Sequence, residues 1–194
     1  MSDFWFYFKI GLQHVLDWQA YDHVLFLLVL VAGYMLKDWK KVVVLVTVFT
    51  IGHMFSMALS VYNIVNVSGR VTELLIPITI IVTGIYNIAA AGQTSKKDRN
   101  ILLLVTVCFG LIHGLGFSSY FKVISSDLEA KGIPLVAFGI GIEAAQCIAV
   151  LVVLLCSGII QILFRFSKRD WIIVLSAIVV GITIPMLMEK FSEF

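Results

Sequence analysis

Histidines and acidic residues interrupt the most apolar parts of this sequence, and their side chains are the ones that could do chemistry. Each of the four histidines lies within or at the edge of a long apolar run: His14, His23, His53 and His113. The carboxylates of Asp22 and Glu143 are placed in the same way, in "AYDHVLF" and "FGIGIEAAQ". Imidazole and carboxylate together are the usual ligands of borderline divalent metal ions such as zinc, nickel, cobalt and copper. If the fold brings these side chains together, they indicate metal binding.

The composition shows what kind of fold must position them. The chain has 194 residues, of which 60% are hydrophobic and 13% charged, and its mean hydropathy is +1.02. A membrane span needs about 20 apolar residues, so this length allows about six spans and little else. We therefore predict an all-α, polytopic membrane helix bundle in which residues 1–194 form a single integral membrane domain. The net charge of +2 gives no indication of a nucleic-acid partner, and none is expected.

The apolar runs give the expected helices. They cover residues 22–36, 42–65, 71–91, 101–123, 134–164 and 171–188. Each is predicted to be a transmembrane helix. Because the first run is short, the preceding segment Phe4–Leu16 is predicted to be an amphipathic helix that lies along the membrane interface, with Trp5, Tyr7 and Trp18 at headgroup level.

Basic residues are concentrated in alternate loops. The intervals "KDWKK", "SKKDR" and "RFSKRD" contain nine of the 14 lysines and arginines: Lys37, Lys40, Lys41, Lys96, Lys97, Arg99, Arg165, Lys168 and Arg169. Loops rich in these residues usually stay in the cytoplasm. This pattern predicts that both termini lie outside.

With that topology, the rise of an α-helix predicts the depth of each polar residue. His53 is expected about 18 Å from the inner face, and Glu143 about 14 Å beyond Pro134. The other candidates are expected at or near the outer half of the membrane. Buried ionisable groups cost roughly 2.5 to 3.5 kcal/mol each on insertion scales, so they usually pair or bind something. The predicted metal ligands are His14, Asp22, His23, His53, His113 and Glu143.

Other polar residues are expected to support these ligands. Thr50 and Ser56 lie three residues from His53, and Gln146 lies three residues from Glu143, so each pair shares a helix face. Glu73 opens the third span beside Arg70, with which it could instead form an ion pair. Residues in such positions can fix an imidazole tautomer or orient a carboxylate. We therefore predict Thr50, Ser56, Glu73 and Gln146 as residues that orient the metal ligands.

The same residues lie in segments that resemble the HupE/UreJ family of small membrane proteins. The segments are "GLQHVLDWQAYDHVLF", "VFTIGHMFSMALS", "TELLIPIT" with the later "YN", "FGLIHGLGFSS" and "FGIGIEAAQ". The family is described as nickel or cobalt permeases associated with hydrogenase and urease systems. The resemblance implies roles for His14, Asp22, His23, Thr50, His53, Glu73, Thr79, Asn87, His113, Glu143 and Gln146. It also implies a location in the inner membrane of a bacterium.

Three functions remain open from the sequence. A permease would capture a hydrated divalent ion outside and replace its waters further in. An intramembrane metal-dependent hydrolase or transferase would act on a lipid, lipoprotein or peptide at the outer leaflet, with Glu73 or Glu143 as general base. A polar core could also simply hold the helices together, or assist the assembly of an exported protein. The expected partners are the lipid bilayer and a divalent transition metal, whose identity stays open, as does the oligomeric state.

Overall fold

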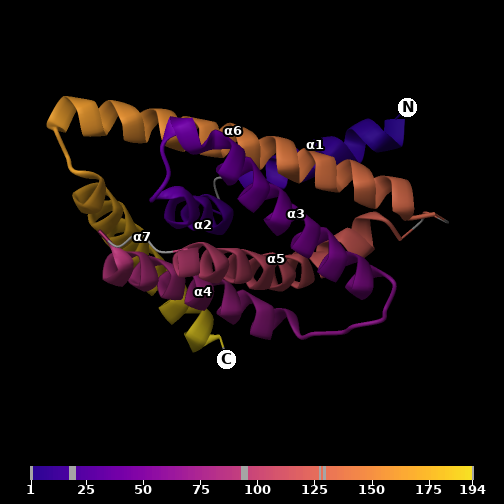
Figure 1. Cartoon of the computed structure of the whole chain (residues 1–194). Coiled ribbons are helices and arrows are strands. Elements are labelled where there is room, and N and C mark those ends of the chain that lie inside the picture. Colours follow the sequence, from indigo (N-terminus) through magenta and orange to yellow (C-terminus); the bar gives the residue numbers. More distant parts are fainter. Residues whose placement is uncertain (1, 18–20, 93–95, 127, 129, 194) are drawn as a thin grey trace.

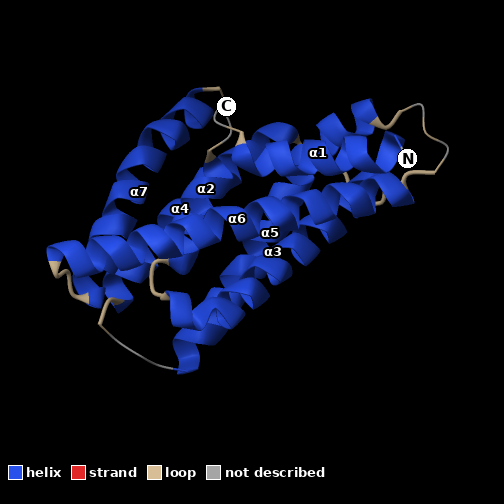
Figure 2. Ribbon diagram, turned by 90° about the horizontal axis from the view of Figure 1, so that it is seen from above, coloured by secondary structure: helices blue, strands red, loops and turns tan. Residues whose placement is uncertain are grey.

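The computed structural model describes residues 2–17, 21–92, 96–126, 128 and 130–193, and in this part of the chain the regular structure is entirely helical (Figures 1 and 2). The α-helices are α1 (Ser2–Leu16), α2 (Asp22–Val31), α3 (Trp39–Val61), α4 (Gly69–Ala90), α5 (Lys96–Ile124), α6 (Gly132–Phe164) and α7 (Lys168–Ser192). A short 3-10 helix, η1 (Leu36–Asp38), precedes α3. The prediction of an all-α bundle is confirmed.

In the described part of the chain, five helices are long and apolar enough to cross a membrane. They cover Leu36–Val61, Gly69–Ala90, Ile101–Ile124, Gly132–Phe164 and Lys168–Ser192. These ranges agree with the last five predicted spans. The first predicted span, 22–36, differs: α2 has only ten residues. At 1.5 Å per residue it is about 15 Å long, about half of the hydrocarbon thickness.

Helix α1 packs along α6 through one face, while Phe4, Trp5 and Phe6 at its start are exposed. Trp18 lies outside the described residues. Gly11 lies against the backbone carbonyl of Phe138, and Gly141 lies against the backbone of Phe8. A side chain at either glycine would collide with the facing backbone, so the two helices can approach this closely only without one. The Tyr7 hydroxyl also donates a hydrogen bond to the carbonyl of Ile124 at 2.8 Å.

Helices α1 and α2 follow one another along α5 and run antiparallel to it. Residue numbers rise along α1 and α2 while those of their partners fall along α5. The contacting pairs, in order, are Tyr7 with Phe121, His14 with Phe117, Asp22 with His113, and Phe26 with Phe109. The two short helices therefore contact successive turns of α5, with His14 near the end of α1 beside Phe117 and Asp22 at the start of α2 beside His113.

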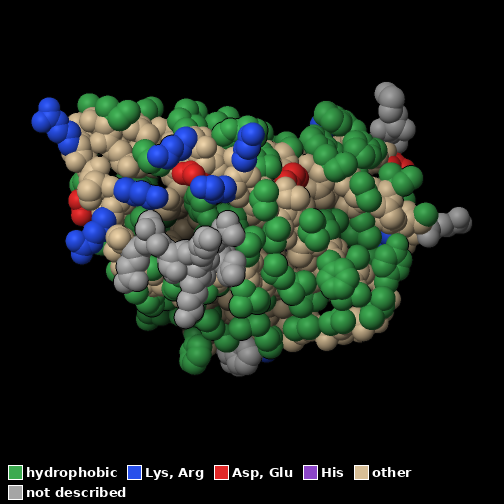
Figure 3. Space-filling model, in the orientation of Figure 1, with side chains coloured by type: hydrophobic (Ala, Val, Ile, Leu, Met, Phe, Trp, Pro, Cys, Tyr) green, Lys and Arg blue, Asp and Glu red, His purple; other side chains and the backbone are tan. Residues whose placement is uncertain are grey.

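The basic intervals meet at one end of the bundle, which we call the basic end. The Arg169 side chain packs against Gly92, and Ile172 near the start of α7 packs against Gly33. In Figure 3 lysines and arginines gather at the left of the molecule, where α6 is followed by α7 in Figure 1. At the opposite end, Lys122 donates to Asn63 at 3.0 Å. The basic intervals and the less basic loops therefore lie at opposite ends of the bundle, as the loop sequences predict.

Close packing of α3 against α5 brings two histidine-bearing segments together. A Cβ atom at Gly110 would collide with the carbonyl oxygen of Phe49, and one at Gly114 with the carbonyl oxygen of His53. Glycine at both positions allows the two backbones to touch. Because Gly114 adjoins His113, this contact places His113 near His53.

Candidate metal centre

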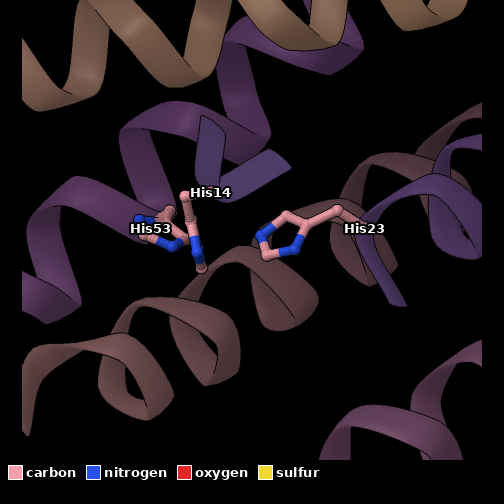
Figure 4. A group of neighbouring side chains, drawn as sticks. All are labelled: His14, His23 and His53. Carbon is pink, nitrogen blue, oxygen red and sulfur yellow. The ribbon is translucent and has the colours of Figure 1, made fainter. Parts of the chain in front are cut away.

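Four imidazoles from four different helices converge in the interior. His14 comes from α1, His23 from α2, His53 from α3 and His113 from α5. The ring centroid of His23 lies 4.5 Å from that of His14 and 4.2 Å from that of His113, and the rings of His14 and His53 are 5.8 Å apart. Figure 4 shows three of them, with His14 between His53 and His23. We call these four histidines and Asp22 the histidine cluster.

The cluster contains two overlapping groups that could hold a metal ion. One consists of His14, His23 and His53, and the other of Asp22, His23 and His113. Within each group, one ligand atom per residue lies within 4.8 Å of the others. His23 belongs to both groups. Five of the six predicted ligands are therefore brought together by the fold.

Asp22 links two of the imidazoles. Its Oδ1 lies 3.2 Å from Nδ1 of His23, and its Oδ2 lies 2.8 Å from Nε2 of His113. Oδ1 also accepts from the backbone N–H of His23 at 2.9 Å. A carboxylate only accepts hydrogen bonds, so each of these ring nitrogens donates. The hydrogen therefore occupies Nδ1 of His23 and Nε2 of His113, which leaves the other nitrogen of each ring with a free lone pair.

The remaining ring nitrogens have the property that a metal ligand needs. Among the described residues, Nε2 of His14, Nε2 of His23, both ring nitrogens of His53 and Nδ1 of His113 are buried without a hydrogen-bond partner. His53 is 0% exposed and His23 is 1% exposed. Buried polar atoms normally have partners, and leaving them without one costs free energy. A cation with a preference for imidazole nitrogen fits these atoms.

Aromatic rings close the cluster toward the basic end. Phe109 lies 4.2 Å from the ring of His113, and Phe26 stacks on Phe109 at 3.5 Å between centroids. Phe49 completes this group, 5.7 Å from both Phe26 and Phe109. All three phenylalanines are buried. We call Phe26, Phe49 and Phe109 the first aromatic layer.

A second aromatic layer, Phe117, Phe121 and Phe138, covers the other side of the cluster. Phe117 lies 3.9 Å from the ring of His14 and stacks on Phe138 at 5.0 Å. Phe121 packs against Phe138 at 5.5 Å. The histidine cluster therefore lies between two sets of phenylalanines along the length of the bundle.

Comparison with known proteins identifies the family of the chain. The profile of the family described as HupE / UreJ protein matches residues 1–190. The chain belongs to the HupE/UreJ family. No curated protein and no solved structure was found to match it. Three of the five segments that resemble the family supply every residue of the histidine cluster in this HupE/UreJ protein.

Glu143, the sixth predicted ligand, is not brought together with the cluster. Its Oε1 accepts from the Thr47 hydroxyl at 2.6 Å, and its Oε2 accepts from the Thr50 hydroxyl. Glu143 lines a groove of about 660 Å³ between α3 and α6 in this HupE/UreJ protein, whose lining includes Met54 and Gly139. Gly139 and Glu143 share one face of α6, whereas Phe138 faces the histidines.

The predicted supporting residues contact other groups than the imidazole rings. The Ser56 hydroxyl donates to the backbone carbonyl of His53 at 3.2 Å, and Thr50 lies 3.1 Å from Oε1 of Gln146. Glu73 is exposed and accepts from Lys190 at 3.0 Å. Among the described residues, the carboxylate that hydrogen-bonds to the imidazoles is that of Asp22, which the sequence predicted as a ligand.

Sequence reasoning missed Thr47 and the two aromatic layers. Thr47, Thr50 and Met54 have helical spacing of three and four residues, so they lie on one face of α3. That spacing could have indicated a second polar contact with α6. The phenylalanines gave no such signal, because aromatic residues are common throughout an apolar sequence: the chain has 14 phenylalanines.

Proposed function

We propose that this HupE/UreJ protein binds a divalent transition metal ion through His14, His23 and His53 and carries it across the membrane as cargo. One observation supports this above all: three imidazoles from three helices, with His23 and His53 buried and His14 half-buried, place nitrogen atoms within 4.8 Å of one another, and their Nε2 atoms have no partner among the described residues. Neutral imidazole is a ligand for nickel, cobalt, zinc and copper. The family favours nickel or cobalt as the metal.

In this proposal Asp22 positions the ligands. Metal-binding histidines usually donate their second ring N–H to a carboxylate, which fixes the ring and makes the other nitrogen more basic. Asp22 makes this contact with His23 and with His113. His113 stacks on His23, and its Nδ1 is free, so it is the fourth candidate ligand.

The enclosure of the cluster supports transport. A transport site must exchange its ion with one side at a time, and the two aromatic layers cover the cluster on both sides along the bundle. Metal-dependent hydrolysis or group transfer would need a general base beside the metal. Glu73 and Glu143, the two expected bases, have their contacts with Lys190 and with threonines instead.

The proposed topology has six crossings of a bacterial inner membrane, with both termini outside. Helices α1 and α2 together form the first crossing, because their side chains contact successive residues of α5 from Phe121 to Phe109. Half-helices within one crossing are found in transporters at the depth of the binding site. The basic end, with its concentration of lysine and arginine, faces the cytoplasm.

Uptake of nickel into vesicles containing the purified protein tests the function. We expect uptake by the wild type and at least a tenfold loss in His53→Ala, with a matching loss of nickel affinity in detergent. Thr183→Ala, a buried substitution in α7 away from the cluster, is the control for general damage and should retain both. Tight nickel binding without uptake would contradict transport and favour an enzyme. Full nickel affinity in His53→Ala would contradict the metal site.

A further inference from the structure

A second polar site lies between α3 and α6, and it consists of oxygen atoms. Both carboxylate oxygens of Glu143 lie within hydrogen-bonding distance of a threonine hydroxyl, those of Thr47 and Thr50. The Thr50 hydroxyl lies 3.1 Å from Oε1 of Gln146 and 3.2 Å from the carbonyl oxygen of Val46. Carboxylate, hydroxyl, amide and carbonyl oxygens are the ligands that hard cations prefer.

The site has more oxygen–oxygen contacts than donor hydrogens to fill them. The Thr50 hydroxyl has one hydrogen, but it faces three acceptor oxygens, from Glu143, Gln146 and Val46. Thr50 can donate to only one of them. The Gln146 amide can turn so that its NH2 group donates to the Thr50 oxygen, which leaves one contact, with Glu143 or with Val46, in which oxygen faces oxygen. Gln146 is 0% exposed, and its Nε2 has no partner among the described residues. A small cation among the oxygens would turn the repulsive contact into an attractive one.

The charge of the site also indicates a cation. The ion pairs formed by the described residues do not include Glu143. Its carboxylate adjoins a groove lined mainly by apolar side chains such as Ile51, Phe55 and Leu135. A lone charge in such surroundings is costly. One monovalent cation neutralises one carboxylate, whereas a divalent cation would leave a net positive charge.

We propose that Glu143, Thr47, Thr50 and Gln146 bind a sodium ion at a site separate from the histidine cluster. The donor set contains no imidazole nitrogen, which separates its chemistry from that of the transition-metal site. Thr50 lies one turn before His53 on α3, so an ion at this site fixes the part of α3 that presents His53. The inference does not depend on the proposed transport of nickel.

Thermal unfolding of the purified protein in detergent tests the sodium site. Sodium chloride is titrated against choline chloride at constant ionic strength, and unfolding is followed by tryptophan fluorescence. We expect sodium to raise the unfolding midpoint by roughly 5 °C at saturation, because a ligand that binds only the folded state stabilises it. Potassium should have a smaller effect and choline none.

Two variants and a control locate the effect. Glu143→Gln and Thr50→Val should each abolish the sodium-dependent shift. Glu73→Gln removes an exposed carboxylate outside the groove and should retain it. Equal midpoints in sodium and choline, or an undiminished shift in Glu143→Gln, would overturn the proposal. So would stabilisation by acid that depends on Glu143 and is indifferent to sodium, because it would assign the site to a proton. Nickel binding, measured separately by calorimetry, tests the histidine cluster alone.

Discussion

Oδ2 of Asp22 lies 2.8 Å from Nε2 of His113, although the two residues are 91 positions apart in the sequence. This contact ties the first turn of α2 to the middle of α5. The other oxygen of the same carboxylate holds His23. One acidic side chain therefore sets the hydrogen positions on two imidazoles, and through them the nitrogens that remain for a metal.

Substitution of Asp22 tests this positioning role. Asp22→Asn keeps the shape of the side chain, but its amide nitrogen cannot accept a hydrogen bond, so one imidazole loses its acceptor. We expect nickel affinity to fall 10- to 100-fold, as is typical for residues that orient a metal ligand. Isothermal titration calorimetry measures it, with Asp3→Asn, an exposed site on α1, as control. Unchanged affinity would show that Asp22 does not orient the ligands.

The contact between α3 and α5 predicts a large difference between two glycine substitutions. Gly114→Ala would push a methyl group into the carbonyl oxygen of His53, whereas a Cβ atom at Gly158 meets nothing within 4 Å. Gly114→Ala should therefore lower the free energy of unfolding by about 1 to 3 kcal/mol. Gly158→Ala should be neutral or stabilise by up to about 1 kcal/mol, because alanine favours helix. Unfolding midpoints measure both, and equal midpoints would contradict the close packing.

The second aromatic layer predicts how fast a bound metal leaves. Phe117→Ala removes the ring that covers His14, so nickel should be released to a chelating dye roughly tenfold faster, which corresponds to a barrier about 1.4 kcal/mol lower. Stopped-flow absorbance follows the release. Phe191→Ala, at a side chain that is 70% exposed, is the control. Release from Phe117→Ala at the wild-type rate would show that this layer does not limit exchange.

Accessibility labelling tests the proposed topology. In a chain whose three cysteines are replaced by alanine, Ser126→Cys should react with an impermeant maleimide added outside intact cells. Lys168→Cys, at the basic end, should react only after the cells are permeabilised. Both positions are exposed, so burial does not limit either reaction. The reverse pattern would invert the orientation of the whole bundle.

Depth along the membrane was predictable from the sequence, but direction around each helix was not. Counting 1.5 Å per residue placed His53, His113 and Glu143 at a similar level. The two histidines both contact His23 in the cluster, but Glu143 lies on a different face of α6 from Phe138 and binds threonines. The rise per residue gives only the position of a side chain along the helix axis. The face that a side chain presents depends on which helix packs against it, and one sequence does not specify that.

The sequence did not predict the short length of α2 in the first crossing, for a related reason. Hydropathy adds up apolar residues without distinguishing lipid-facing side chains from buried ones. Eight of the ten residues of α2 are buried, so its apolar character reflects contact with other helices. Hydropathy also gave no sign that the segment Phe4–Leu16 packs along α6 at Gly11.

Because α1 ends at Leu16 and α2 begins at Asp22, His14 and His23 are carried by two independently packed pieces. The distance between their nitrogens depends on how α1 packs against α6 at Gly11 and Gly141, and on how α2 packs against α4, α6 and α7. A continuous helix would fix that spacing at the pitch of its own backbone. Here the distance between the two histidine nitrogens changes when one short helix packs differently. Related proteins could therefore bind ions of different size while their long helices keep the same packing.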